Sequence, residues 1–188
     1  MRIVGGSARG KKLNLPEDKR IRPTADRTRE ALFNILGHGS EFRTDHGPLP
    51  LNARVMDAFC GTGALGLEAL SRGAAEVIFM DNHSGSLKLA RQNVNALGFN
   101  RQTSLMPQDA TTCRKGGPPV DLLLMDPPYN MDLAAPALQN LRDTNWITSG
   151  AIAVVELAAK EAFNVPDGFD ILDERKYGAA RLVFLKVR

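Results

Sequence analysis

The stretch Asp57-Ala-Phe-Cys-Gly61-Thr-Gly63-Ala-Leu-Gly66 decides the fold of this chain of 188 residues. Its glycines match the spacing G-x-G-x-x-G, and it joins an apolar run at 55–60 to a helical pattern at 64–72, which Gly73 ends. A glycine turn between a strand and a helix lets the backbone come close to a ligand above the helix N-terminus. The stretch therefore predicts the first strand-turn-helix unit of an α/β fold.

Downstream of this unit, strand and helix patterns continue to alternate. Apolar runs predict strands at 77–81, 103–107, 120–125 and 151–157, and helical patterns cover 84–97 and 132–142. The segments 171–177 and 181–187 alternate apolar and polar residues across Gly178, which predicts an antiparallel hairpin. We therefore expect a mostly parallel seven-stranded sheet with helices on both faces, and ligands outside the carboxyl ends of its strands.

The N-terminal part of the chain has a different charge from the rest. Residues 1–30 carry nine Lys or Arg against four Asp or Glu, a net charge of +5, whereas the remainder carries −2. A basic segment beside a mildly acidic body is typical of contact with a polyanion, and equally of a solvated tail. Charge alone leaves both interpretations open.

The same region predicts a small appendage to the main domain. The pattern predicts a helix over 25–36 that Thr24 caps and Gly37 ends, followed by a connecting loop. We expect an N-terminal basic arm and helix in 1–52 and the α/β domain in 53–188.

Composition excludes several classes of protein. The chain is 43% hydrophobic and 24% charged, which is ordinary for a globular domain. It has neither the run of about 18 apolar residues that a membrane span needs nor the core of a signal peptide, so we expect a cytoplasmic protein. Its two cysteines and three histidines show no metal-ligand spacing, so neither a metal nor a disulfide is expected.

Asp81 follows Gly61 by twenty residues and comes at the end of the second predicted strand. A carboxylate at this place accepts hydrogen bonds from ribose hydroxyls, which predicts an adenosine-containing cofactor. Nicotinamide dinucleotides and S-adenosylmethionine (SAM) both suit the spacing. Asp57 favours SAM, because a carboxylate beside the loop attracts a sulfonium and an ammonium but repels a pyrophosphate.

The motif Asp126-Pro-Pro-Tyr129 follows the predicted strand at 120–125. Its two prolines stiffen the backbone and remove two N–H donors, which leaves the Asp126 carboxylate and the Pro127 carbonyl as acceptors. Together they suit a planar NH₂ group, on a base or on a side-chain amide, while Tyr129 offers a face for stacking. Held in this way, the nitrogen can approach an electrophilic methyl group. Asp126, Pro127 and Tyr129 are the catalytic candidates.

Three longer blocks carry a resemblance to a known family. They are Arg2-Ile-Val-Gly-Gly-Ser-Ala-Arg-Gly-Lys-Lys-Leu13, Arg22-Pro-Thr-Ala-Asp-Arg-Thr-Arg-Glu-Ala-Leu-Phe-Asn-Ile-Leu36 and Phe59-Cys-Gly-Thr-Gly-Ala-Leu-Gly-Leu-Glu-Ala-Leu-Ser-Arg-Gly73. With the D-P-P-Y motif, they resemble the bacterial 16S rRNA (guanine(966)-N(2))-methyltransferase family, in which 966 is an rRNA position. The resemblance covers nearly the whole chain and implies the Rossmann-like class I fold of SAM-dependent methyltransferases.

The resemblance also implies an activity, a site and partners. The activity is methyl transfer from SAM to the exocyclic N2 of a guanine in 16S rRNA. The substrate would be naked rRNA, the 30S small subunit or its assembly intermediate. The enzyme is expected to be a monomer. The implied SAM-binding residues are Asp57, Phe59, Gly61, Gly63, Asp81, Asn82, Asp109 and Ala110. The implied contacts to rRNA phosphates are Arg9, Lys11, Lys12, Arg20, Arg22 and Arg27. The target guanine would be unpaired or flipped out to stack on Tyr129.

Three other functions stay open at this point. A DNA adenine-N6 methyltransferase keeps the class and changes the substrate. An NAD-dependent oxidoreductase needs only the glycine loop and Asp81. A non-catalytic RNA-binding protein could keep the fold, although the intact D-P-P-Y motif disfavours it.

Overall fold

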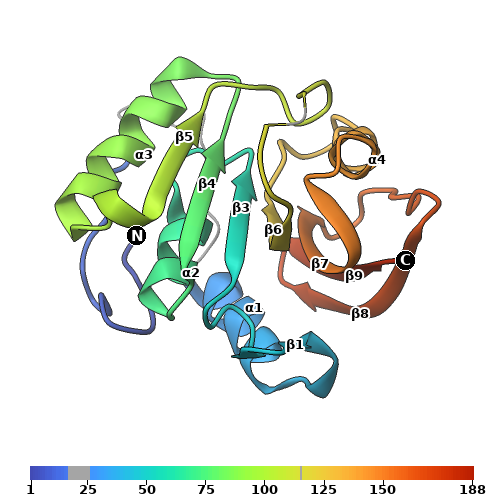
Figure 1. Ribbon diagram of the computed structural model, residues 1–188, viewed down its shortest axis with the longest axis horizontal. Coiled ribbons are helices and arrows are strands. Elements are labelled where there is room, and N and C mark those ends of the chain that lie inside the picture. Colours follow the sequence, from blue (N-terminus) through green and yellow to red (C-terminus); the bar gives the residue numbers. More distant parts are fainter. Residues whose placement is uncertain (17–25, 115) are drawn as a thin grey trace.

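The protein is built around a twisted seven-stranded sheet (Figure 1). The structure is a computed structural model, and it describes residues 1–16, 26–114 and 116–188. The strand order is β5-β4-β3-β6-β7-β9-β8, in which β9 alone pairs antiparallel with both neighbours. The strands are β3 (Arg54–Ala58), β4 (Glu76–Met80), β5 (Thr103–Met106), β6 (Val120–Met125), β7 (Ile147–Ala158), β8 (Phe169–Tyr177) and β9 (Ala180–Val187). This topology confirms the predicted mostly parallel sheet with its C-terminal hairpin.

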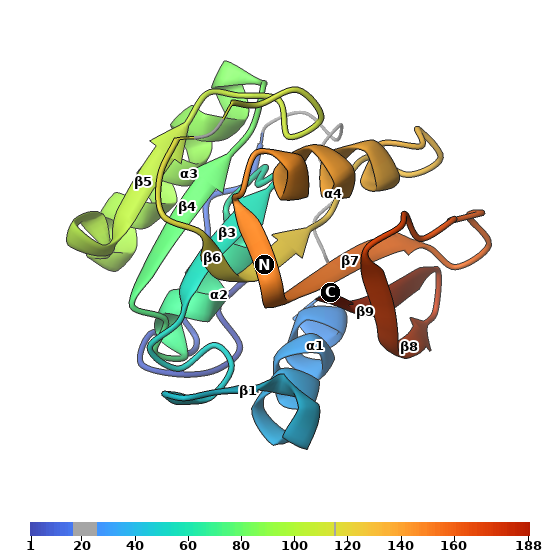
Figure 2. The ribbon, with the colours of Figure 1, turned by 45° about the vertical axis from the view of Figure 1, so that its right-hand side comes forward.

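Helices cover both faces of the sheet (Figure 2). On one face lie α1 (Asp26–His38), α2 (Ala64–Ser71) and α3 (Ser84–Leu97), and on the other lies α4 (Ala134–Asp143). In β6, Leu124 packs in the apolar cluster that includes α1, α2 and α3, and Leu123 packs in the cluster that includes α4. Because both faces are covered, the four residues of the strand after Asp121 form a continuous apolar run. Within the described residues, no helix has the length and apolar character needed to cross a membrane.

Gly66 sets the distance between α2 and the sheet. A Cβ at this position would lie 2.5 Å from the ring of Phe79 in β4, so a larger residue would push the helix away. All eight residues of α2 are buried. The third glycine of the loop is therefore required for packing.

Several predicted boundaries shift in the structure. The first helix continues through Gly37 to His38, so Gly37 does not end it, and Thr24 lies outside the described residues. The helix expected from residue 132 begins at Ala134, because Asp132 has a φ of 52°, which is incompatible with a right-handed helix. The loop expected before Asn52 contains a 3₁₀ helix and a small hairpin. These are Ser40–Phe42, β1 (Arg43–Thr44) and β2 (Gly47–Pro48).

Residues 1–16 pack onto the body of the protein across α2 and α3. Ile3, Ala8 and Leu13 are buried in the same apolar cluster as the helices of that face. Backbone hydrogen bonds such as Ile3 N–H to Lys11 O, at 2.9 Å, fold the segment back on itself. The described part of the expected arm therefore belongs to the main core, and the division of the chain at residue 52 stays a prediction.

Candidate cofactor and substrate site

The glycine loop lies between the end of β3 and the start of α2. Three of its residues have left-handed backbone conformations, with φ of 61° at Phe59, 53° at Gly61 and 79° at Gly63. Glycine adopts such angles without steric cost, whereas Phe59 is strained there. Residues held in sparsely populated conformations cluster at ligand sites. The strained Phe59, and the backbone N–H groups that begin α2, therefore face the expected ligand edge of the sheet.

Asp81 ties this loop to the end of β4. One carboxylate oxygen accepts the Gly61 N–H at 3.0 Å, and the other accepts the His83 N–H at 2.8 Å. Each oxygen has a second lone pair for another donor. The structure thus brings Asp81 to the place where a ribose is expected, and its contact with the ribose stays a prediction.

Asn82 and Asp109 lie in direct contact, although they are far apart in the sequence. The Asn82 amide donates to Asp109 Oδ2 at 3.2 Å, while Oδ1 accepts from the Thr111 N–H at 2.8 Å and the Thr111 hydroxyl at 2.7 Å. The side-chain hydrogen bond from Thr111, followed by the one from its backbone, lowers the pKa of Asp109. Ala110, which follows Asp109, is buried. These three residues form one group beside the loop, as the cofactor prediction requires.

Asp57 is a buried carboxylate beneath the loop. Its side chain accepts the Gly66 N–H at 2.8 Å, and the residue is 1% exposed. Burial above all raises the pKa of Asp57 well beyond its ordinary value; the Gly66 hydrogen bond opposes this, while the negative charges of Asp126 and Asp81 add to it. An edge with three carboxylates suits a cationic ligand. The negative charge of these carboxylates suits the sulfonium and the ammonium of SAM.

The motif Asp126-Pro-Pro-Tyr129 follows directly after β6. Asp126 and Tyr129 are half-buried and Pro127 is buried. The parallel register of Met125 with Val155 places Asp126 beside Glu156 of the neighbouring strand β7. The structure therefore brings the three catalytic candidates to the same edge as Asp57 and Asp81.

Glu156 is a site residue that sequence reasoning missed. It is 4% exposed, and its Oε1 accepts the Tyr129 hydroxyl at 2.8 Å. The available signal was a single acidic residue near the end of the apolar run at 151–157. The pattern of that run predicts a strand and gives no role to the carboxylate.

The predicted phosphate contacts divide into two groups. Exposed side chains are found at Arg9, Lys11, Lys12 and Arg27. Arg20 and Arg22 lie outside the described residues. Arg29, which contributes to the basic charge of the arm, is 0% exposed and is directed into the protein, so it adds nothing to an RNA-facing surface.

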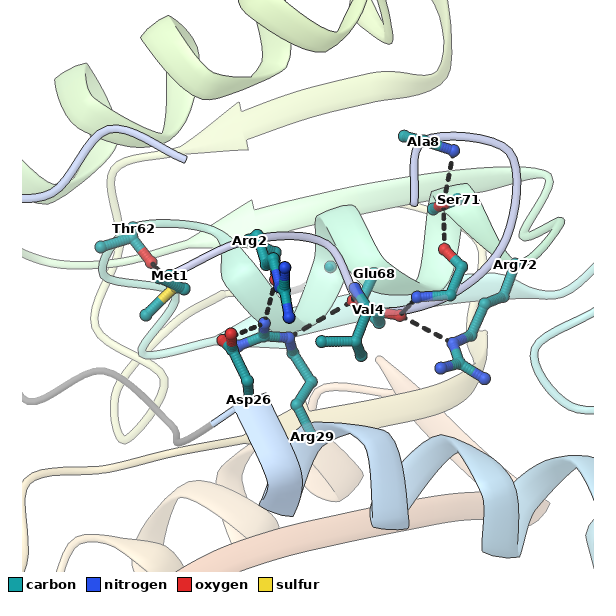
Figure 3. A network of polar contacts seen from close by, with 12 residues as sticks. Met1, Arg2, Val4, Ala8, Asp26, Arg29, Thr62, Glu68, Ser71 and Arg72 are labelled. Carbon is teal, nitrogen blue, oxygen red and sulfur yellow. Dashed lines mark hydrogen bonds and ion pairs between the residues drawn. The ribbon is translucent and has the colours of Figure 1, made fainter. Parts of the chain in front are cut away.

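Arg29 belongs to a polar network that anchors residues 1–16 to α2 (Figure 3). It donates to the backbone carbonyl of Arg2, to Asp26 at 2.9 Å and to Glu68 at 3.4 Å. Glu68, itself 0% exposed, also accepts the N–H groups of Val4 and Gly5, at 2.9 and 2.8 Å. The N-terminal segment is therefore held by a buried ion pair.

A second anchor connects this segment with the glycine loop. Asn93 of α3 is 0% exposed. Its amide oxygen accepts the Asn14 N–H at 2.7 Å, and its amide nitrogen donates to Asn14 O at 3.1 Å and to Thr62 O at 2.9 Å. One buried side chain thus touches the N-terminal segment and the loop expected to hold the cofactor.

The parallel sheet with its terminal hairpin, the glycine loop, Asp81 and the motif after β6 define a class I methyltransferase, a class whose methyl donor is SAM. Within this class the chain belongs to the family described as Conserved hypothetical protein 95, whose model matches residues 1–186. This confirms the family resemblance drawn from the sequence.

Curated relatives and solved structures agree with this assignment. The chain is 31% identical to Ribosomal RNA small subunit methyltransferase D of Escherichia coli strain K12, over 95% of this chain and 85% of that protein. It is 30% identical to the protein of the same name from Haemophilus influenzae, over 95% and 89%.

Among solved structures, yhhF from Escherichia coli has a TM-score of 0.84 at 29% identity, covering 100% of this chain and 98% of its own. TrmN from Thermus thermophilus has a TM-score of 0.68 at 23% identity, covering 86% and 48%, and supports the fold alone.

Proposed function

We propose that this methyltransferase transfers a methyl group from SAM to the exocyclic N2 of a guanine in 16S rRNA of the small ribosomal subunit. The relatives named Ribosomal RNA small subunit methyltransferase D support the rRNA substrate. The observation that carries the proposal is the position of Asp126-Pro-Pro-Tyr129, an acceptor pair and a flat ring at the edge where the glycine loop and Asp81 meet.

The cofactor side of the site would be formed by residues around the glycine loop. Asp57 and the loop would hold the methionine end, and Asp81 the ribose. The neighbouring Asn82, Asp109 and Ala110 would surround the adenine, with Phe59 covering the loop. When bound, SAM supplies an activated methyl group on its sulfonium.

The chain's own contribution to the reaction is to orient the amine. Asp126 and the Pro127 carbonyl accept the two hydrogens of the exocyclic NH₂, which directs the nitrogen lone pair toward the methyl group. Tyr129 stacks on the base and fixes its plane. After transfer the nitrogen is cationic and loses a proton readily. No covalent enzyme intermediate is needed.

The RNA would meet the protein along its basic N-terminal part. Arg9, Lys11, Lys12 and Arg27 are exposed and suited to phosphates, and the proposal extends this surface to Arg20 and Arg22. The target guanine must be unpaired or flipped out, because the N2 amine of a paired guanine is hydrogen-bonded to cytosine and its base is held in the stack. The proposal includes a monomeric cytoplasmic enzyme with an RNA-facing part in 1–52 and a methyltransferase domain in 53–188.

The proposal is tested by finding the methylated atom. Tritiated SAM is offered with naked transcribed 16S rRNA, with small subunits assembled on that unmodified RNA, and with duplex DNA. We expect label in one or both rRNA substrates, and N2-methylguanosine after digestion to nucleosides. Label in DNA alone, or in N6-methyladenine, would overturn the proposal in favour of a DNA methyltransferase.

A further inference from the structure

Glu156 occupies an unusual place for a carboxylate. It lies near the end of β7 within the run Ala151-Ile-Ala-Val-Val-Glu-Leu157, in which it is the one ionisable residue, and it is 4% exposed. A carboxylate is costly to bury unless hydrogen bonds compensate the loss of water. Nothing in the strand itself requires an acidic residue here. Its hydrogen-bond partners should therefore indicate its function.

Tyr129 is one of those partners, and it lies just after β6, the strand that pairs in parallel with β7. Its hydroxyl donates to Glu156 Oε1 at 2.8 Å, the usual length of an O–H···O hydrogen bond. Because Glu156 is almost fully covered, a base entering from solvent would meet the half-buried ring of Tyr129 and not the carboxylate.

Tyr129 lies in the irregular segment between β6 and α4. Tyr129 follows two prolines outside β6, and Asn130 and Asp132 have φ of 58° and 52°, so α4 begins only at Ala134. The far end of the ring is held by the hydrogen bond to Glu156. A hydrogen bond at the phenol oxygen fixes the direction of the ring's long axis, and because the hydroxyl hydrogen prefers to lie in the ring plane, the acceptor also favours one orientation of that plane.

We propose that Glu156 is a positioning residue that fixes the ring plane of Tyr129, so that the stacked target base presents its amine to Asp126. The inference rests on the proposed function in taking Tyr129 as the surface beneath the base. It assigns Glu156 no contact with the substrate. The acceptor oxygen carries the effect, so an amide at this position should replace the carboxylate.

A double-mutant cycle between Glu156 and Tyr129 tests this role. We would measure kcat and KM for small subunits assembled on unmodified 16S rRNA, and the Kd of SAM by equilibrium dialysis, for E156Q, E156L, E156M, Y129F and the doubles Y129F/E156L and Y129F/E156M. The cycle isolates the interaction of the two side chains from their other contacts. Glu161→Leu is the matched control, because Glu161 accepts the Ala158 N–H at the end of β7 and has no hydrogen bond to a site residue among the described residues.

We expect E156Q and E161L to stay within about threefold of the wild type in kcat/KM, and E156L and E156M to lose about tenfold to a hundredfold with an unchanged SAM Kd. In the Y129F background, E156L and E156M should lower kcat/KM little further. Wild-type kinetics for E156L and E156M would refute the proposal, and so would a full additional loss in Y129F. If neither apolar variant binds SAM, Glu156 holds the fold and the proposal is wrong.

The cycle separates this inference from the proposed function. The assay records methyl transfer whichever atom receives the methyl group, and product analysis identifies that atom independently. A product other than N2-methylguanosine, together with coupling between Tyr129 and Glu156, would reject the function and retain the positioning role. N2-methylguanosine as the product, without coupling between Tyr129 and Glu156, would retain the function and reject the positioning role.

Discussion

Two buried carboxylates, Asp57 in β3 and Glu68 in α2, have opposite surroundings. Glu68 accepts four hydrogen bonds, from the N–H groups of Val4 and Gly5 and from the side chains of Arg29 and Arg72 (Figure 3). Asp57 accepts one N–H, from Gly66, and is repelled by two nearby carboxylates, so its pKa is raised, mainly by burial.

The difference teaches how to tell an anchor from a binding site. Around Glu68 the protein itself supplies two cations, so the charge is compensated and the residue joins the N-terminal segment to α2. Around Asp57 the described structure supplies negative charge and one amide, so the carboxylate is neutralised either by a proton, as its raised pKa indicates, or by a bound cation. Mutations around Glu68 should therefore change the stability of the protein, and mutations around Asp57 should change cofactor binding and turnover.

The largest effect is expected at Asp126, which belongs to the region around Asp57. Asp126→Ala removes one of the two acceptors for the amine and should lower kcat by about a hundredfold or more. SAM should still bind, because Asp126 is predicted to contact the substrate and not the cofactor. Tritium transfer and equilibrium dialysis measure the two quantities. Wild-type turnover in this variant would remove Asp126 from its assigned role.

At Glu68 the comparison predicts a loss of stability. Glu68→Ala leaves the buried guanidinium of Arg29 without its partner in α2 and should lower the free energy of unfolding by about 3–5 kcal/mol. Urea unfolding measures the change. Glu41→Ala, at an exposed position, is the matched control and should stay within about 0.5 kcal/mol. An unchanged midpoint would mean that Glu68 is no anchor.

Asp57→Asn should have opposite effects on binding and on stability. The amide keeps an acceptor for the Gly66 N–H but loses the charge, so SAM affinity should fall about tenfold. The cofactor-free variant should gain about 1 kcal/mol or more in free energy of unfolding at neutral pH, because it no longer buries a carboxylate beside two others. Dialysis and urea unfolding give the two values, and weaker binding together with lower stability would contradict the comparison.

The raised pKa of Asp57 also sets a direction for pH dependence. The folded protein keeps this proton at pH values where the unfolded chain has released it. The stabilising contribution is therefore complete below the unfolded pKa and is lost as the pH rises through the folded value. The affinity for a cationic cofactor should rise over the same range. Asp57→Asn should abolish both slopes, and slopes unchanged in that variant would exclude Asp57 as their origin.

The sequence predicted the parts of the molecule whose signals are local. The helix Ser84–Leu97 matches its predicted bounds, because an amphipathic pattern ends at Gly98, which has the left-handed φ of 78°. The strand Val120–Met125 also matches, because burial on both faces gives the run of four apolar residues that follows Asp121. The glycine loop, Asp81 and the D-P-P-Y motif likewise meet at the predicted edge.

The features that sequence reasoning missed depend on long-range pairing. Arg29 and Glu68 look like surface charges on two helices, and only the fold brings them together beneath the N-terminal segment. Glu156 differs from its apolar neighbours, but its partner Tyr129 lies 27 residues away. A buried charge is recognisable only when its partner is known, so these residues became visible with the tertiary structure.

The smallest expected effect is at Asn93, where the two regions meet. Asn93→Ala removes the hydrogen bonds to Asn14 and Thr62 and should lower the free energy of unfolding by about 1–3 kcal/mol. SAM affinity should fall a few-fold, because the loop loses one backbone support. Asn95→Ala, at an exposed position of the same helix, is the matched control for both measurements. If Asn93→Ala lowers stability and leaves SAM affinity at the control value, the N-terminal anchor and the cofactor loop are energetically independent. The anchoring region and the binding region would then be separate in energy, although Asn93 contacts both.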